Sequence, residues 1–265
     1  MKPGWIERMG PIRADPQADA PRIAFAEAIR DEDPRRAALI EAQLRYAAAE
    51  RAEDDSAYGQ LYAAAEALLR PEDAAGLPAL GLRPILRRGF VQHITADAGL
   101  WLARGAEVRA QHPILELSLG KAEAHLPALL AQRALDGIVS LDLAGSRVGD
   151  EGAALLADAP GLSTLRWLDL RRNGVSRQGL DRLCASPLGR RLRWLHLRLP
   201  GEGTPHDEPI EEEGRLIEFL APPLGMELEA RHGPLPFLHV HPRRLRFFPP
   251  SMSRFVGENA TRDRE

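Results

Sequence analysis

The sequence predicts an α/β protein in which an N-terminal helical module precedes strand–helix units and a proline-rich segment follows them. Three observations predict this class: helix-start signals in the first 70 residues, a motif that recurs every 27 residues, and ten prolines in the last 66 residues. We expect a helical module over residues 1–75, strand–helix units over 85–199, an irregular cap over 200–250 and a disordered tail over 251–265.

The recurring motif is the strongest of these observations. The triplets Leu141-Asp142-Leu143, Leu168-Asp169-Leu170 and Leu195-His196-Leu197 are 27 residues apart, and the same offset relates Gly152 to Gly179, Leu156 to Leu183 and Pro160 to Pro187. A period of about 20–29 residues with an L-x-x-L-x-L core is typical of leucine-rich repeats. Such units cannot bury their apolar side alone, so they stack. We therefore predict a short solenoid of the ribonuclease-inhibitor-like subtype, with parallel strands inside and helices outside.

Each predicted unit follows the same physical logic. Leucines at alternate positions point inward, and the residues between them point outward, because side chains alternate across a strand. Further strands are expected over 89–94 and 114–119, and outer helices around 152–156 and 179–183. Asn173 is expected to bond the backbone where a strand ends, with Ser146 in the same role one repeat earlier.

The first 70 residues contain two sharp helix starts. Asp19 and Asp33 each precede a proline by one or two residues, so the carboxylate can cap amides while proline occupies the first turn. Helices are predicted from these starts and over 56–69, and Asp97 is expected to cap a later one. The predicted inward positions are Ile23, Ala26 and Ile29, then Leu39, Ile40, Gln43 and Leu44, then Tyr58, Leu61, Tyr62, Ala65 and Leu68.

The character of the chain changes from Pro200. Frequent prolines prevent regular stacking from continuing. A helix over 210–220, a strand over 226–230 and a hairpin of 237–240 with 245–248 are expected to form a degenerate closing repeat, because the last unit's core needs a cover.

Composition narrows the functional classes. The net charge of −3 gives no electrostatic argument for nucleic acid or an anionic membrane. Lys2 and Lys121 are the only lysines, so arginine supplies the other 33 of the 35 basic residues. A single cysteine, Cys184, excludes an internal disulfide, and no apolar run reaches the length of a signal peptide or membrane helix. We expect a cytoplasmic protein.

Several separated blocks resemble one bacterial family. These blocks are residues 12–16, 19–22, 33–37, 40–43 and the later Arg88-Gly89-Phe90-Val91-Gln92-His93-Ile94. They are similar, in order, to the repeat-companion domain and to the R-G-F-V segment that follows it before leucine-rich repeats. The chain departs from that pattern at 25–29, where the family's Asp-Trp pair is absent. The resemblance implies an accessory or adaptor role, often beside bacterial signalling or defence genes, and no enzymatic activity.

The outward side of the repeat strands is the predicted binding site. Trp167 and Trp194 occupy equivalent positions on neighbouring strands, so they should lie side by side. Exposed tryptophan beside arginine is the composition of an interface hot spot. The competing interpretation is that the C-terminal tail folds over this side and buries both rings. The predicted partner-binding residues are Glu116, Ser118, Ser140, Asp142, Trp167, Asp169, Arg171, Trp194, His196 and Arg198.

Three other features of the sequence suggest chemistry: the C-terminal histidines, the single cysteine and a group of C-terminal arginines. His232, His239 and His241 suggest a metal site, although no further ligand stands at a recognisable spacing. Cys184 is expected to be a buried hydrophobe. The arginines at 243, 244 and 246, near Phe247 and Phe248, imitate a nucleic-acid patch but are better explained as a solvated strand edge.

The sequence thus predicts a non-enzymatic adaptor that presents the concave side of leucine-rich repeats to another protein. No cofactor, metal, nucleic acid or membrane is expected. Two alternatives stay open: a structural subunit of a multi-protein assembly, and a metal-dependent hydrolase that uses the C-terminal histidines.

Overall fold

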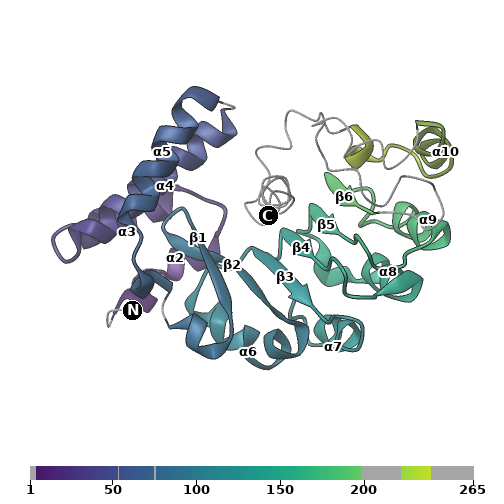
Figure 1. The fold of residues 1–265 in the computed structure, drawn as a ribbon, viewed down its shortest axis with the longest axis horizontal. Helices are drawn as coiled ribbons and strands as arrows, with labels where there is room; N and C mark the ends of the chain where they lie inside the picture. Colours follow the sequence, from purple (N-terminus) through teal and green to yellow (C-terminus); the bar gives the residue numbers. More distant parts are fainter. Residues whose placement is uncertain (1–3, 53, 75, 198–221, 240–265) are drawn as a thin grey trace, which may run out of the picture. The chain divides into compact units, whose positions relative to one another are not determined.

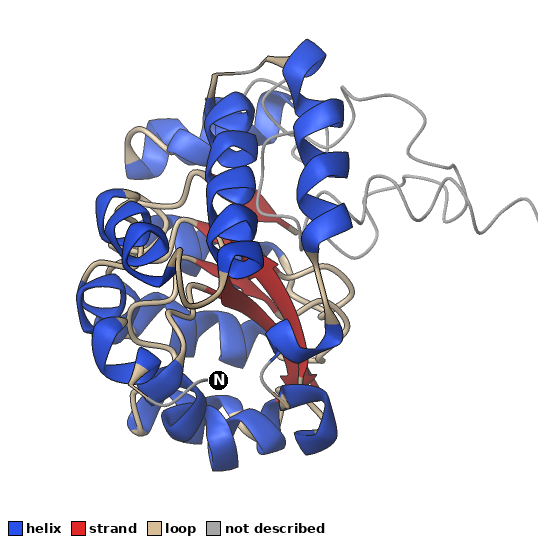
Figure 2. Ribbon diagram, turned by 90° about the vertical axis from the view of Figure 1, so that its left-hand side faces the viewer, coloured by secondary structure: helices blue, strands red, loops and turns tan. Residues whose placement is uncertain are grey.

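The chain folds into a mixed α/β structure with a six-stranded, mostly parallel sheet (Figure 1, Figure 2). The computed structural model describes residues 4–52, 54–74, 76–197 and 222–239. The strand order follows the chain: β1 (Arg83–Arg87), β2 (Phe90–Asp97), β3 (Glu116–Gly120), β4 (Ser140–Asp142), β5 (Trp167–Asp169) and β6 (Trp194–His196). The chain is divided into two compact units. The first contains residues 1–95 and 106–115, and the second contains residues 96–105 and 116–265.

The first unit is mainly helical. Its helices are α1 (Trp5–Arg8), α2 (Gly10–Ala14), α3 (Ala20–Ile29), α4 (Pro34–Arg51) and α5 (Asp55–Leu68), with short 3₁₀ turns η1 (Pro71–Ala74) and η2 (Leu77–Leu80). The Asp33 carboxylate accepts a 2.9 Å bond from the Arg36 amide, which confirms the predicted cap of α4. The predicted Asp19 cap is wrong, because no side-chain bond caps α3 and Asp19 instead pairs with Arg51 and Arg88.

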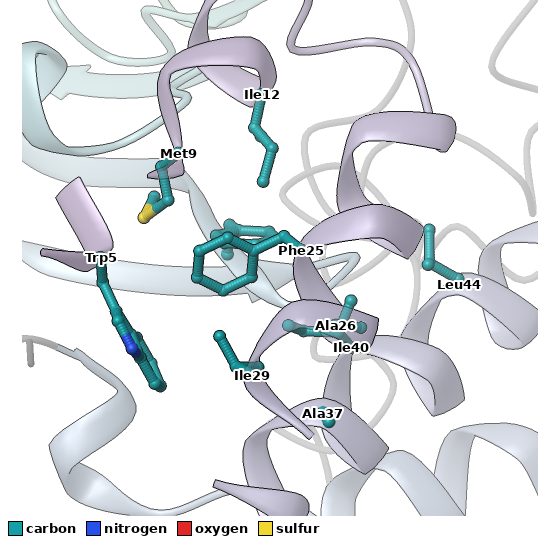
Figure 3. Packing of buried hydrophobic residues seen from close by; sticks show 10 residues of the cluster. Trp5, Met9, Ile12, Phe25, Ala26, Ile29, Ala37, Ile40 and Leu44 are labelled. Atoms are coloured by element: carbon teal, nitrogen blue, oxygen red, sulfur yellow. The ribbon is translucent and has the colours of Figure 1, made fainter. Parts of the chain in front are cut away.

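The core of this unit surrounds Phe25 (Figure 3). The Phe25 ring meets Trp5 and Phe90 edge to face, at centroid distances of 5.6 and 5.4 Å. The sequence pattern does not predict α1 or α2. Trp5 of α1, Ile12 of α2 and Met9 between them belong to this core. The predicted inward position of Ile23 is wrong: Ile23 is 48% exposed, because the buried side of α3 carries Phe25, Ala26 and Ile29.

A tight turn joins β1 and β2, and the blocks that carry the family resemblance meet at it. Arg88 and Gly89 have φ of 48° and 83°, as a two-residue hairpin requires. The Gly89 carbonyl accepts a 2.7 Å bond from Arg36, and its amide donates a 2.7 Å bond to Gln43. The Arg22 guanidinium lies 5.4 Å from the centre of the Phe90 ring. A Cβ atom at Gly89 would lie 2.9 Å from the Ile40 Cα, so only glycine fits there.

The second unit contains the repeat strands. Strands β3 to β6 pair in parallel, and the helices α7 (Leu126–Ala131), α8 (Gly149–Asp158) and α9 (Arg177–Ala185) lie along one side of them (Figure 1). The helix α6 (Ala98–Gln111) contributes its first turns, and η3 (Pro160–Leu162) precedes β5. On the helix side, Leu117, Leu141 and Leu168 are fully buried. The predicted parallel strands and inward leucines are therefore confirmed.

Polar bridges bind neighbouring repeats to each other. Asn173 donates to the Leu143 and Arg171 carbonyls at 2.9 and 3.0 Å, and its oxygen accepts from the Val148 amide at 3.2 Å. The Ser146 hydroxyl donates to the Leu119 carbonyl at 2.8 Å. The predicted role of Asn173 and Ser146 is confirmed.

The described part of the C-terminal region packs on the last repeat. The helix α10 (Pro222–His232) is joined to α9 by an ion pair of Arg231 with Asp181 and by a hydrogen bond between His232 and the same carboxylate. The short η4 (Pro236–His239) lies against β6. The strand predicted over 226–230 is wrong, because Leu224 and Leu228 are buried at helical spacing within α10. Residues 237–239 form η4 instead of the first hairpin strand. The helix predicted over 210–220 and the strand over 245–248 lie outside the described residues.

In the described ranges, no helix combines the length and apolar character that a membrane crossing requires.

Candidate partner-binding face of the repeat strands

Two rows of side chains cross strands β3 to β6 on the side opposite the leucines. The register aligns Glu116, Ser140, Trp167 and Trp194 in one row, and Ser118, Asp142, Asp169 and His196 in the other. We call these eight residues the polar face. Nine of the ten predicted partner-binding residues are described: these eight and Arg171. Arg198 lies outside the described residues.

The two tryptophans are direct register partners, which confirms that they occupy neighbouring positions. They differ in exposure. Trp194 is 9% exposed, and its ring meets the His196 imidazole edge to face at a centroid distance of 5.2 Å. Trp167 is partly exposed. Trp167 therefore offers more accessible aromatic surface than Trp194.

Asp169 is the centre of the second row. Its side chain is fully buried and forms a bidentate ion pair with Arg171, with N–O distances of 2.7 to 3.0 Å. The same carboxylate accepts a 2.9 Å bond from the Arg171 amide, and it lies 3.8 Å from the His196 Nδ1. Because burial and then Arg171 lower the pKa of His196 well below its usual value, the imidazole is neutral at pH 7.

Asp142 stands beside Asp169 on the next strand. Its carboxylate accepts a 2.9 Å bond from the Ala144 amide. Burial, together with the negative charge of Asp169, raises the pKa of Asp142 to about 6. The polar face thus contains two adjacent carboxyl groups, one of which, Asp142, ionises only near pH 6.

Replacing Asp142 with Asn is expected to stabilise the protein at pH 7.5 by about 1 to 2 kcal/mol. The folded state holds this proton more tightly than the unfolded chain, so ionised Asp142 costs stability above about pH 6. Asn removes that cost and retains an oxygen for the Ala144 amide.

Chemical unfolding from pH 4 to 8 checks this prediction. The stability difference between the two proteins should be largest above about pH 6 and disappear below about pH 4. His196 acts in the opposite direction, since its lowered pKa makes acid destabilising in both proteins. A constant difference across this range would contradict the assignment.

The predicted exposure of this face is largely wrong. Glu116, Ser140, Asp142, Asp169, Trp194 and His196 are buried, whereas Ser118, Trp167 and Arg171 are partly exposed. Contacts between neighbouring side chains contribute to this burial. Asp169 pairs with Arg171, and the Trp194 ring meets the His196 ring. In the register, Ser140 stands between the larger Glu116 and Trp167.

The residues considered for catalysis or metal binding are not brought together. His232 pairs with Asp181 at 2.8 Å, His239 pairs with Glu229 at 2.7 Å, and His241 lies outside the described residues. Over the part of the chain that the structure describes, no three His, Cys, Asp or Glu side chains form a group that could hold a metal ion. Burial raises the pKa of Cys184 to about 12, so this thiol is not a nucleophile near neutral pH.

Two further arginines adjoin the polar face and are not among the predicted residues. Arg166 and Arg193 directly precede Trp167 and Trp194 within the repeated hexapeptide Leu-Arg-Trp-Leu-x-Leu. The exact repetition of this pair was the available signal.

Comparison of the chain with protein-family models, with curated proteins and with solved structures gave no match.

Proposed function

We propose that the chain is a cytoplasmic, non-enzymatic adaptor whose leucine-rich-repeat solenoid presents the polar face to a partner protein. The observation that carries the proposal is the register of the four parallel strands, which places Trp167 of β5 beside Trp194 of β6. Tryptophan and arginine dominate the binding energy of protein interfaces. The leucine row and the Asn173 bridges hold the strands rigidly, and a rigid surface loses less entropy on association.

Trp167 is the anchor in this proposal. It is partly exposed. Ser118, in the second row, and Arg171, which follows β5 in the chain, are also partly exposed. Asp169 holds the Arg171 guanidinium through two oxygens, so that side chain is already ordered before a partner arrives. Trp194 is buried, so its role in this proposal is to support the face and not to contact the partner.

The N-terminal module supports the proposed relationship to the repeat-companion family. Arg36 of block 33–37 and Gln43 of block 40–43 both bond Gly89 of the R-G-F-V segment. Arg22 of block 19–22 lies against Phe90 of the same segment. Motifs that are separated in the sequence thus serve one structural purpose. An accessory role, with signalling or defence as its setting, is the function that this relationship favours.

Photo-crosslinking tests the proposal. A photoreactive phenylalanine analogue replaces Ser118 on the polar face or, as a control, the exposed Gln178 on α9. In cells of the source organism we expect one protein to be crosslinked from position 118 and not from position 178.

Two results would overturn the proposal. One is equal capture from both positions, which indicates non-specific contact. The other is a crosslink from position 118 to the chain's own residues 240–265, which indicates that the tail is the occupant of this face.

A further inference from the structure

Four arginines lie at the amino-terminal ends of the parallel strands β5 and β6, along the border of the sheet where these strands begin. Arg166 precedes β5, and Arg190, Arg191 and Arg193 precede β6. We call these four residues the arginine edge. The Arg193 amide donates to the Arg166 carbonyl at 2.8 Å, so the two loops lie side by side. Arg190 and Arg193 are exposed, and the other two are partly exposed.

Among described residues, no carboxylate pairs with any of the four. Other arginines of the same unit are paired: Arg133 with Asp136 at 2.6 Å, and Arg182 with Asp158 at 2.7 Å. Asp136 lies in the connection that precedes β4, at the same edge of the sheet, and its charge is already engaged by Arg133. Within the described ranges, the arginine edge therefore carries positive charge that no paired carboxylate balances.

The arginines act on one another. Burial, followed by the charges of Arg191 and Arg193, lowers the pKa of Arg166. The Arg191 Nε is buried and has no hydrogen-bond acceptor among the residues that the structure describes. Like charges held together in this way favour an anion that would neutralise them.

The arginine edge adjoins the polar face along the chain, because Arg166 and Arg193 directly precede Trp167 and Trp194 at the start of strands β5 and β6. The Arg166 Nη1 donates to the Ser163 and Leu165 carbonyls, both at 2.9 Å, so its guanidinium is held on the loop. A ligand along this edge would meet ordered charge beside exposed aromatic surface.

We propose that the arginine edge binds an acidic segment of the partner protein, with Arg166 and Arg193 each engaging a carboxylate next to Trp167. Guanidinium pairs with carboxylate in a planar, bidentate geometry. The chain's net charge of −3 gives no general attraction for the long polyanionic backbone of nucleic acid, so a local group of four arginines favours a short acidic segment. This inference rests on the proposed function, because it specifies the chemistry of that partner.

The probe is a fluorescently labelled oligoglutamate peptide, added to the full chain at about 50 mM salt. Two exposed arginines are removed in Arg190→Gln/Arg193→Gln, which leaves the Arg166 loop bonds intact. The control Arg45→Gln/Arg83→Gln removes the same charge from exposed positions in the first unit. We expect the first variant to weaken binding by at least about tenfold and the control by less than about twofold.

Arg166→Gln/Arg193→Gln should weaken binding at least as much. Equal losses in test and control variants, no binding of oligoglutamate to the parent chain, or tighter binding of an oligothymidylate of equal charge would each overturn the inference. None of these results depends on the photo-crosslink from position 118, so the proposed function is tested separately.

Discussion

Replacing Asn173 with Ala is expected to lower the free energy of unfolding by about 3 kcal/mol, because several buried backbone groups lose their hydrogen-bond partner at once. The Asn173 side chain is 4% exposed. It satisfies the Leu143 and Arg171 carbonyls and the Val148 amide. Alanine cannot replace any of these bonds, and water has little access to the site. A buried polar group without a partner costs about 1–3 kcal/mol.

Urea unfolding followed by tryptophan fluorescence measures this loss, since Trp167 and Trp194 lie in the same unit. Gln178→Ala on the exposed surface of α9 is the matched control, and it should change stability by less than about 0.5 kcal/mol. Asn173→Asp retains the acceptor and loses both donated bonds, so it should also be strongly destabilised. A loss below about 1 kcal/mol in Asn173→Ala would show that the bridge between repeats is dispensable.

The repeat strands could be predicted from the sequence because their signal is periodic. Leucines at alternate positions and at a fixed 27-residue offset determine both the direction of each side chain and the register between strands. The same offset placed Trp167 beside Trp194. The Asn173 bridge could be predicted for the same reason, since it depends on position within the repeat.

Other elements gave no such signal. The strand β1 contains Pro84, which argues against a strand except at the edge of a sheet, and β1 is the first strand in the order. The turn between β1 and β2 places Arg88 in the left-handed region, which is uncommon for arginine. In α10, the alternating pattern of residues 226–230 imitates a strand, while the leucines at 224 and 228 have the spacing of a helix.

The burial of the polar face could not be predicted from alternation. The pattern correctly placed Asp142, Asp169 and His196 on the side opposite the leucines. Whether such side chains are exposed depends on their contacts with each other, and these contacts follow from three-dimensional packing. Asp169 illustrates the difference: it is polar, it lies on the side opposite the leucines, and it is nevertheless fully buried and paired with Arg171.

Trp167→Ala is expected to weaken binding of the crosslinked partner by about 2 kcal/mol or more, a loss of about thirtyfold in affinity. The reason is that the proposed function assigns the apolar anchor of the face to this partly exposed indole. Trp194→Ala is less informative, because its ring is 9% exposed and its removal also leaves a cavity beside His196. Gln178→Ala on α9 is the control, and circular dichroism verifies that each variant is folded.

Calorimetric titration of the purified partner into the parent chain, Trp167→Ala and Gln178→Ala therefore tests the adaptor role most directly. The account predicts a dissociation constant about thirtyfold higher for Trp167→Ala and unchanged for Gln178→Ala. Equal affinity of folded Trp167→Ala and the parent chain would contradict the assignment of this face as the binding surface.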